Sequence, residues 1–213
     1  MCEAVGKQWH MRDRKRGVLP DGLRNVDVES GWGCSRYQGW VQGYAWHVVC
    51  SAPANHLTIP LLAEVEPNNV QENRVFVRMI AQIPRARRRV LADEGYDDNE
   101  LIRQVEQKVG SGFGRRMLLP MKVYKYTPDG RREYALWFKS EAGQKLFRRR
   151  KTTIERWFGR LKDLFDYKRC WMKGLKNNRA LMLLILLAYQ LLIYYNWNRG
   201  AKLARVKEIL DGI

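Results

Sequence analysis

Residues 90–97 read VLADEGYD, an apolar run that stops at Asp93 and turns through Gly95. Residues 70–83, before this stretch, and residues 98–108, after it, repeat apolar side chains at helical spacing. The local order is therefore helix, strand, turn and helix. This order predicts an α/β layer, in which helices cover a sheet.

Asp93 is a candidate functional residue because of its place at the end of the strand. Carboxylates at strand ends in open α/β sheets face the crevice in which ligands bind. The alternative is that Asp93 or Asp97 caps the helix that follows, since Asp is a preferred N-cap residue. The local sequence leaves both roles open.

Two β-rich runs precede this region, at 43–50 and 56–65. They predict an antiparallel pair of strands joined by a short loop. Pro60 interrupts the second run, and proline cannot donate a hydrogen bond to a β ladder. We therefore expect a bulge or an edge position at Pro60.

A second pair of β-rich runs, 121–126 and 132–138, flanks Asp129 and Gly130. An Asp-Gly turn between such runs predicts a β-hairpin. The remaining chain has helical patterning. Helices are expected over 140–165, 174–197 and 201–210.

The composition limits the class of protein. The 213 residues carry 39 Lys and Arg against 22 Asp and Glu, a net charge of +17, and 46% are apolar. The apolar share excludes a disordered chain, and the charge predicts a polyanionic partner, with nucleic acid favoured over an acidic membrane. The four cysteines form no Cys-x-x-Cys pair, and residues 1–7 lack the apolar segment of a signal peptide. We therefore expect free thiols, no zinc site and a cytoplasmic protein.

The most apolar stretch is 180–195, where fifteen of sixteen residues are apolar and Gln190 is the exception. As a helix it would span roughly 24 Å, short of the roughly 30 Å of a bilayer core. The Lys and Arg residues on both sides of it fit either a buried helix or a membrane anchor. We expect a buried helix of an α/β domain and no membrane partner.

The helix expected at 140–165 carries a second candidate carboxylate, Glu155. At about 100° per residue, its apolar stripe consists of Ile154, Phe158, Leu161 and Phe165. The cations on the face of Glu155 are Arg148, Lys151 and Lys162. One interpretation is an ordinary helix surface with an ion pair between Lys151 and Glu155. The other is a site for a metal ion and a phosphate.

Asp93, Glu155 and the strongly basic body together indicate phosphodiester chemistry. Carboxylate oxygens suit Mg²⁺ or Mn²⁺, and such ions can activate an attacking oxygen and stabilise a leaving one. Basic side chains would hold a nucleic-acid backbone regardless of its sequence. Arg88 lies in a basic run that leads into the strand of Asp93, so it is either a DNA contact or part of a solvated loop.

These motifs resemble those of the DDE transposases of bacterial insertion sequences, which have a ribonuclease-H-like catalytic core. Residues 90–97 are similar to the family's second-aspartate motif, and residues 154–162 to its glutamate motif with a basic residue two turns on. The other similar stretches are 9–14, 26–33, 39–47 and 67–73. The resemblance covers nearly the whole chain in the family's order.

The resemblance implies a ribonuclease-H-like mixed sheet flanked by helices, with a β-hairpin insertion at about 111–138 before the glutamate-bearing helix. Residues 39–213 would form the catalytic domain, and residues 1–38 a basic, loop-rich segment ahead of it. The family's first aspartate lies on the first core strand, which the resemblance puts upstream of Met1. The chain is therefore expected to begin inside the gene, without that strand.

The implied function is that of a DNA transposase, which cleaves DNA at the element ends and transfers the freed 3′-hydroxyl to target DNA. Asp93 would be the second metal-binding aspartate and Glu155 the third acidic ligand, with Mg²⁺ or Mn²⁺ as the cofactor. Lys162 would contact a phosphate near the scissile bond. The other DNA-binding candidates are Lys151, Arg148 and Arg88. The implied partners are double-stranded DNA and a second copy of the chain, at the nucleoid in the bacterial cytoplasm.

Two departures from the family pattern matter. The family has an arginine one turn and an aromatic residue two turns before the glutamate, and here Lys151 and Arg148 hold those places. Only two of the three carboxylates are found. The candidates to replace the missing aspartate are Asp13, Asp21 and Asp27. The alternative function is therefore a non-catalytic, DNA-binding remnant of a transposase.

Overall fold

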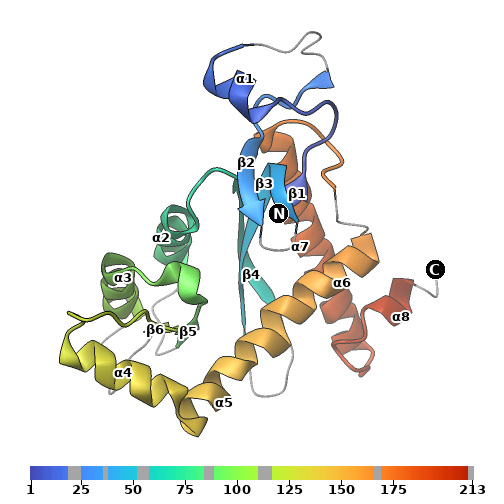
Figure 1. Cartoon of the computed structure of the whole chain (residues 1–213). Coiled ribbons are helices and arrows are strands. Elements are labelled where there is room, and N and C mark those ends of the chain that lie inside the picture. Colours follow the sequence, from blue (N-terminus) through green and yellow to red (C-terminus); the bar gives the residue numbers. More distant parts are fainter. Residues whose placement is uncertain are drawn as a thin grey trace. The chain divides into compact units, whose positions relative to one another are not determined.

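The chain forms two compact units (Figure 1). The first unit comprises Met1–Gln71 and Trp157–Ile213, and the second comprises Glu72–Arg156. The computed structural model describes residues 1–18, 25–35, 38–51, 58–83, 89–109, 117–165 and 169–210. Each unit is an assembly of helices and strands with its own sheet, which confirms the predicted α/β class.

The sheet of the first unit is built around one long strand. Its strands are β1 (Cys2–Glu3), β2 (Gly31–Ser35), β3 (Gly39–Cys50) and β4 (Pro60–Pro67). β3 is central, and all three partners run antiparallel to it. Gly43 pairs with both β1 and β2, and Tyr44 pairs with both β1 and β4. A residue has only two ladder edges, so β2 and β4 share one edge of β3 while β1 lies on the other.

The predicted pair of strands at 43–50 and 56–65 is confirmed by β3 and β4. Their register shifts between Val49 and Cys50, where Cys50 pairs with Pro60. The irregularity expected at Pro60 is therefore present, because proline supplies no amide hydrogen to the ladder. Gly43 has no room for a side chain, since a Cβ there would collide with the carbonyl oxygen of Cys2.

The segment predicted as a loop-rich surface, 1–38, is more structured than expected. Beyond β1 and β2 it contains α1 (Met11–Lys15), and Val26, Asp27 and Ser30 are buried. The polar side chains among them are satisfied by the sheet: Gln42 Nε2 donates to Ser30 Oγ at 2.9 Å. Polar composition suggested an exposed loop, but specific hydrogen bonds stabilise the segment against β3.

The apolar helix expected at 174–197 is α7 (Leu175–Asn198), and it packs against β4 (Figure 1). Three polar contacts join them: Arg179 Nη2 lies 2.7 Å from Glu66 Oε1, Arg179 Nε donates to the carbonyl of Val65 at 3.0 Å, and Gln190 Nε2 donates to the carbonyl of Pro60 at 2.7 Å. By length and composition α7 could also cross a membrane, and 39% of its most apolar 18-residue window is buried in the protein. The predicted burial is thus found on one face of the helix. The helix expected at 201–210 is only the short α8 (Lys207–Leu210).

The second unit contains the stretch around Asp93. Its elements are α2 (Glu72–Gln82), β5 (Val90–Leu91), a 3₁₀ turn (Glu94–Tyr96), α3 (Asn99–Val109), β6 (Met117–Leu118), α4 (Asp129–Lys139), α5 (Glu141–Arg150) and a π-helical turn (Lys151–Glu155). β5 and β6 pair in parallel. The helices pack on this short sheet through Ile80, Leu101, Ile102, Val105, Met117 and Leu119. The predicted order helix, strand, turn and helix is confirmed.

The β-hairpin predicted within 111–138 is wrong. Residues 132–138 belong to α4, and no strand covers 121–126. α4 buries Tyr134, Ala135 and Phe138, a spacing of one and four residues that lies on one helical face. A strand would have placed Leu136 on the same face as Tyr134 and Phe138, yet Leu136 is 70% exposed. The Tyr134 hydroxyl also accepts a hydrogen bond from the amide of Leu119 and donates one to its carbonyl, which anchors the helix beside β6.

The helix expected over 140–165 begins after Ser140, whose hydroxyl accepts a hydrogen bond from the amide of Gly143. It runs through α5, the π-helical turn and α6 (Arg156–Phe165). The residues that it buries are Gly143, Thr153, Trp157 and Leu161. Leu161 matches the predicted stripe. Ile154 and Phe158 are only half-buried, because Trp157 takes the central position and packs edge-on against Tyr189 of α7.

Candidate metal centre

Asp93 lies two residues after the end of β5, and its two carboxylate oxygens have different partners. Oδ1 accepts a hydrogen bond from the amide of Gly95 at 3.2 Å and so caps the 3₁₀ turn. Oδ2 lies 3.8 Å from Nη1 of Arg150. The side chain remains 45% exposed. Both roles considered for Asp93, a local cap and a site residue, are therefore compatible with its position.

Two further acidic residues after this turn, Asp97 and Asp98, have structural roles. Asp98 caps α3, since its Oδ1 accepts a hydrogen bond from the amide of Leu101 at 3.0 Å. Asp97 is almost fully buried and forms an ion pair with Arg131 of α4 at 2.5 Å. It also accepts a hydrogen bond from the amide of Lys122 at 2.8 Å. Of the three, Asp93 is the one with an oxygen directed at a cation from the glutamate-bearing helix.

Glu155 is the last residue of the π-helical turn, and 52% of its side chain is exposed. Its Oε1 lies 3.4 Å from Nη2 of Arg150. The same guanidinium therefore contacts both predicted carboxylates, Asp93 through one nitrogen and Glu155 through the other. The expected ion pair of Glu155 with Lys151 is replaced by this contact with Arg150.

The π-helical turn explains why Arg150 reaches Glu155. In an α-helix, residues five apart are separated by about 140° around the axis and face different directions. In a π-helix the hydrogen bonds run from residue i to i+5, so residues five apart lie above one another. The turn Lys151–Glu155 has this geometry and adds one residue to the helical repeat.

The added residue also changes which side chains precede Glu155 in space. The basic residue that contacts Glu155 from the preceding turn is Arg150. The guanidinium carbon of Arg150 is 5.6 Å from the centre of the Phe147 ring. In space, an arginine therefore contacts Glu155 and an aromatic residue contacts that arginine, although counting four and seven residues back along the sequence gives Lys151 and Arg148.

Glu72 and Tyr96, which the sequence did not single out, surround Asp93. A Cβ built on Gly95 would lie 3.2 Å from Asp93 Oδ1 and 3.7 Å from Glu72 Oε2, so the two carboxylates are close neighbours. Partial burial, and then the nearby charge of Asp93, raise the pKa of Glu72 above its ordinary value. Burial and the same two carboxylates raise the pKa of Tyr96. The region around Asp93 is therefore rich in negative charge.

The predicted DNA-binding residues are distributed over both units. Arg148 on α5 and Lys151 in the π-helical turn are exposed. Lys162 is exposed on α6, in the first unit. Arg88 lies outside the described residues.

The aspartates considered as replacements for a missing first aspartate do not resemble metal ligands in the structure. Asp27 is 3% exposed, and its carboxylate accepts hydrogen bonds from the Tyr44 hydroxyl at 2.9 Å, the Gly174 amide at 3.1 Å and the Glu29 amide at 3.3 Å. Asp13 is exposed on α1, and Asp21 lies outside the described residues. Within the described part of the chain, no group of three or more Asp, Glu, His or Cys side chains could hold a metal ion.

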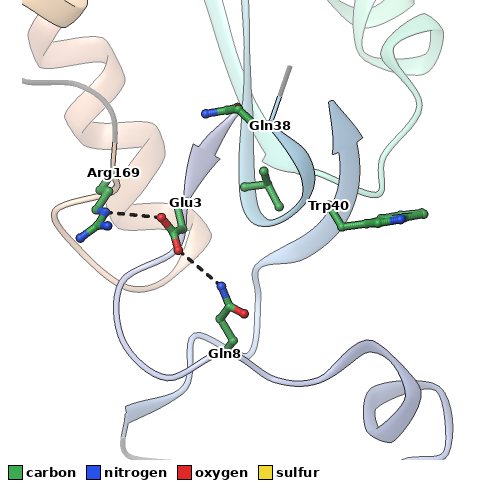
Figure 2. A pocket seen from close by; sticks show the side chains of 6 residues that line it. Glu3, Gln8, Gln38, Trp40 and Arg169 are labelled. Carbon is green, nitrogen blue, oxygen red and sulfur yellow. Dashed lines mark hydrogen bonds and ion pairs between the residues drawn. The ribbon is translucent and has the colours of Figure 1, made fainter. Parts of the chain in front are cut away.

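The first unit has a shallow pocket of about 260 Å³ (Figure 2). Its lining residues are Glu3, Gln8, Gln38, Trp40, Val41 and Arg169. Glu3 is the one carboxylate among the described lining residues, and it is engaged by Arg169 Nε at 3.4 Å and by Gln8 Nε2 at 3.4 Å. The described part of this pocket therefore offers no pair of carboxylates for a divalent ion.

Residues 12–191 match the family model described as "Transposase DDE domain". The match includes Asp93 and Glu155, and it covers the whole second unit and part of the first. Searches of the curated proteins and of the solved structures found no match.

Proposed function

The chain belongs to the transposase DDE domain family, and from this premise we propose that it is an insertion-sequence transposase in which Asp93 and Glu155 hold the divalent metal. The observation that carries the proposal is the convergence of these two carboxylates on one cation, the guanidinium of Arg150. We further propose that residues 39–213 act as the catalytic domain with a ribonuclease-H-like sheet, and that residues 1–38 support it.

The two carboxylates suit the implied ion. Mg²⁺ is usually held by one or two protein carboxylates, together with waters and substrate phosphates. Asp93 and Glu155 are both about half exposed, so water and a phosphate can approach them. The two carboxylates already contact one positive charge, the guanidinium of Arg150, so the space between them accommodates a cation. A site of this composition fits Mg²⁺ or Mn²⁺.

The proposed reaction is an in-line displacement at phosphorus, first by water at the element end and then by the freed 3′-hydroxyl on target DNA. When bound, Mg²⁺ or Mn²⁺ supplies Lewis-acid stabilisation of the charge on the phosphate oxygens. The protein contributes mainly by positioning the DNA. The basic side chains that would hold the backbone phosphates, independently of base sequence, are Arg88, Arg148, Lys151 and Lys162. The proposed partners are double-stranded DNA and a second copy of the chain, at the nucleoid in the bacterial cytoplasm.

The test is nicking of supercoiled DNA by the purified full chain in the presence of Mg²⁺. We expect Asp93→Ala and Glu155→Ala each to reduce the nicking rate by about 100-fold or more, because each removes a metal ligand. Glu133→Ala is the matched control, since Glu133 is an exposed carboxylate on α4 and its removal should leave the rate unchanged. Equal nicking by wild type and by both site variants would refute the proposed role of the two carboxylates.

One observation favours the second candidate function, a DNA-binding protein without catalysis. The described residues bring two carboxylates onto Arg150 and no metal-binding group of three. This alternative predicts salt-sensitive DNA binding by the wild type without any metal-dependent nicking. Nicking that requires Asp93 and Glu155 would exclude it.

A further inference from the structure

We infer that Arg150 is a built-in counter-ion of the proposed metal site: it holds Asp93 and Glu155 together in the metal-free protein and must leave them when a divalent ion binds. The inference rests on the proposed function of these two carboxylates. It makes Arg150 a positioning residue that lowers the affinity of the site for metal ions.

The contacts of Arg150 place it between the two carboxylates. Nη1 lies 3.8 Å from Asp93 Oδ2, and Nη2 lies 3.4 Å from Glu155 Oε1. Arg150 therefore links the end of β5 to the end of the π-helical turn, two elements that are far apart in sequence. Without this positive charge, two carboxylates and the neighbouring Glu72 would face one another and repel.

Both ion pairs of Arg150 are long and therefore weak, so a metal ion can replace the guanidinium. Charge-assisted hydrogen bonds between nitrogen and a carboxylate are typically about 2.7–2.9 Å long, so both contacts here are loose ion pairs. Among the described residues, Nε of Arg150 is buried without a hydrogen-bond partner. The guanidinium carbon lies 5.6 Å from the Phe147 ring centre, a weaker cation–π contact. Arg150 is thus held mainly by the two charges for which a metal ion would compete.

The π-helical turn is the structural device that creates this arrangement. It places Arg150 and Glu155 on the same face of the helix, where a regular α-helix would separate them. π-Helical turns are uncommon and are frequently found at functional sites. Lys151, one residue later, is exposed and forms no comparable bridge among the described residues.

The two states of the site differ in one charge. With Arg150 in place, the two carboxylates carry a net charge of about one negative unit, and a divalent ion must displace the guanidinium. Without Arg150, the ion meets two uncompensated carboxylates, and the attraction between opposite charges a few ångströms apart increases. Removal of the arginine should therefore tighten metal binding. A purely structural arginine would have the opposite effect, because its absence would let the two carboxylates separate.

The experiment measures Mn²⁺ binding to the full chain, without DNA, from the electron paramagnetic resonance signal of free Mn²⁺. The variants are Arg150→Gln and the matched control Arg149→Gln, which removes the same charge from an exposed neighbour on α5. We expect Arg150→Gln to bind Mn²⁺ about tenfold more tightly than wild type, and Arg149→Gln to stay within about twofold. Arg150→Lys keeps the charge but cannot reach both oxygens, and we expect an intermediate affinity. Circular dichroism reports whether each variant is folded.

The outcomes separate this inference from the proposed function. Wild-type affinity that depends on Asp93 and Glu155 supports the metal site. If Arg150→Gln then binds Mn²⁺ no more tightly than Arg149→Gln, or more weakly, the counter-ion role is refuted and the metal site stands. If Arg150→Gln is unfolded, the Mn²⁺ affinity of Arg150→Lys is the deciding measurement. An affinity of Arg150→Lys equal to that of the wild type refutes the counter-ion role of Arg150. Wild-type binding that is unaffected by removal of Asp93 and Glu155 refutes the proposed site itself, and the role of Arg150 with it.

Discussion

The carboxylates of Glu72 and Asp93 converge on the backbone of Gly95, with oxygens 3.7 Å and 3.2 Å from the position that a Cβ on that glycine would take. Glu72 begins α2 and Asp93 follows β5, so two separate elements bring like charges together. Such proximity is unfavourable in the absence of a cation. Burial first, and then this proximity, raise the pKa of Glu72 and make the metal-free protein sensitive to pH.

We expect Glu72→Gln to stabilise the protein at pH 7 in the absence of divalent ions. Because the pKa of Glu72 is raised in the folded state, the folded protein binds this proton more tightly than the unfolded chain does. The contribution to the free energy of unfolding is therefore fully present below the ordinary value of about 4.3 and is lost as the pH rises through the raised pKa. The amide carries no charge and avoids this destabilisation. Urea unfolding at pH 4 and at pH 7 measures the effect.

Glu133→Gln is the control for this comparison, since Glu133 is exposed on α4. The free energy of unfolding of Glu133→Gln should equal that of the wild type at both pH values. If the free energy of unfolding of Glu72→Gln differs from that of the wild type by the same amount at pH 4 and at pH 7, ionisation of Glu72 does not destabilise the protein.

Tyr44→Phe should destabilise the first unit by about 2 kcal/mol, the range found for hydrogen bonds to charged groups. The Tyr44 side chain is fully buried, and its hydroxyl donates to Asp27 Oδ1 at 2.9 Å. Burial and this hydrogen bond raise the pKa of Tyr44, so the hydroxyl remains a donor throughout the accessible pH range. Denaturant titration checks the value. Tyr126→Phe, at an 87% exposed position, should have no measurable effect.

Deletion of Thr152 should preserve the contact between Arg150 and Glu155. The deletion removes one residue from the π-helical turn, so the two side chains become four apart and lie on one face of an α-helix. Insertion of an alanine after Thr152 makes them six apart and directs them to different faces, at about 240°. We expect Mn²⁺ affinity within about twofold of wild type for the deletion, and close to that of Arg150→Gln for the insertion. Indistinguishable affinities for the two variants would mean that the helical register is unimportant.

The proposed DNA-binding residues should be visible in the salt dependence of binding. Removal of one side chain that neutralises a phosphate reduces the slope of log K against log salt concentration by about 0.9. We expect Lys162→Gln, Lys151→Gln and Arg148→Gln each to show this change in fluorescence anisotropy titrations with duplex DNA. Lys139→Gln, on α4, tests whether removal of any positive charge has the same effect. A slope that changes equally for Lys139→Gln would argue against specific phosphate binding.

The parts of the fold that follow a regular period were predictable. α2, α3 and the pair β3 and β4 match their apolar patterns because each buries one face on a sheet or a helix. α4 was not predicted, because Asp129-Gly130 between aromatic runs has the composition of a hairpin. The packing of Tyr134 and Phe138 with Leu118 of β6 and Phe147 of α5 decides in favour of a helix, and that packing is a tertiary effect.

The candidate site likewise contains residues that the sequence predicted and residues that it did not. Asp93 and Glu155 stand out in the sequence through a strand end and a helical face. Arg150 was missed because regular helical periodicity turns it away from Glu155, and no local pattern marks a π-helical turn. Glu72 was missed because its proximity to Asp93 depends on how α2 packs against the 3₁₀ turn.

The most direct test of a divalent ion at Asp93 and Glu155 is cleavage of the protein backbone by Fe²⁺ substituted for Mg²⁺. With ascorbate and peroxide, the bound iron generates hydroxyl radicals that cut the nearby chain, and mass spectrometry locates the breaks. We expect breaks near residues 93 and 155, suppressed by excess Mg²⁺ and absent in the Asp93→Asn/Glu155→Gln double variant. Breaks confined to other regions, or an unchanged pattern in the double variant, would contradict a metal site at these two carboxylates.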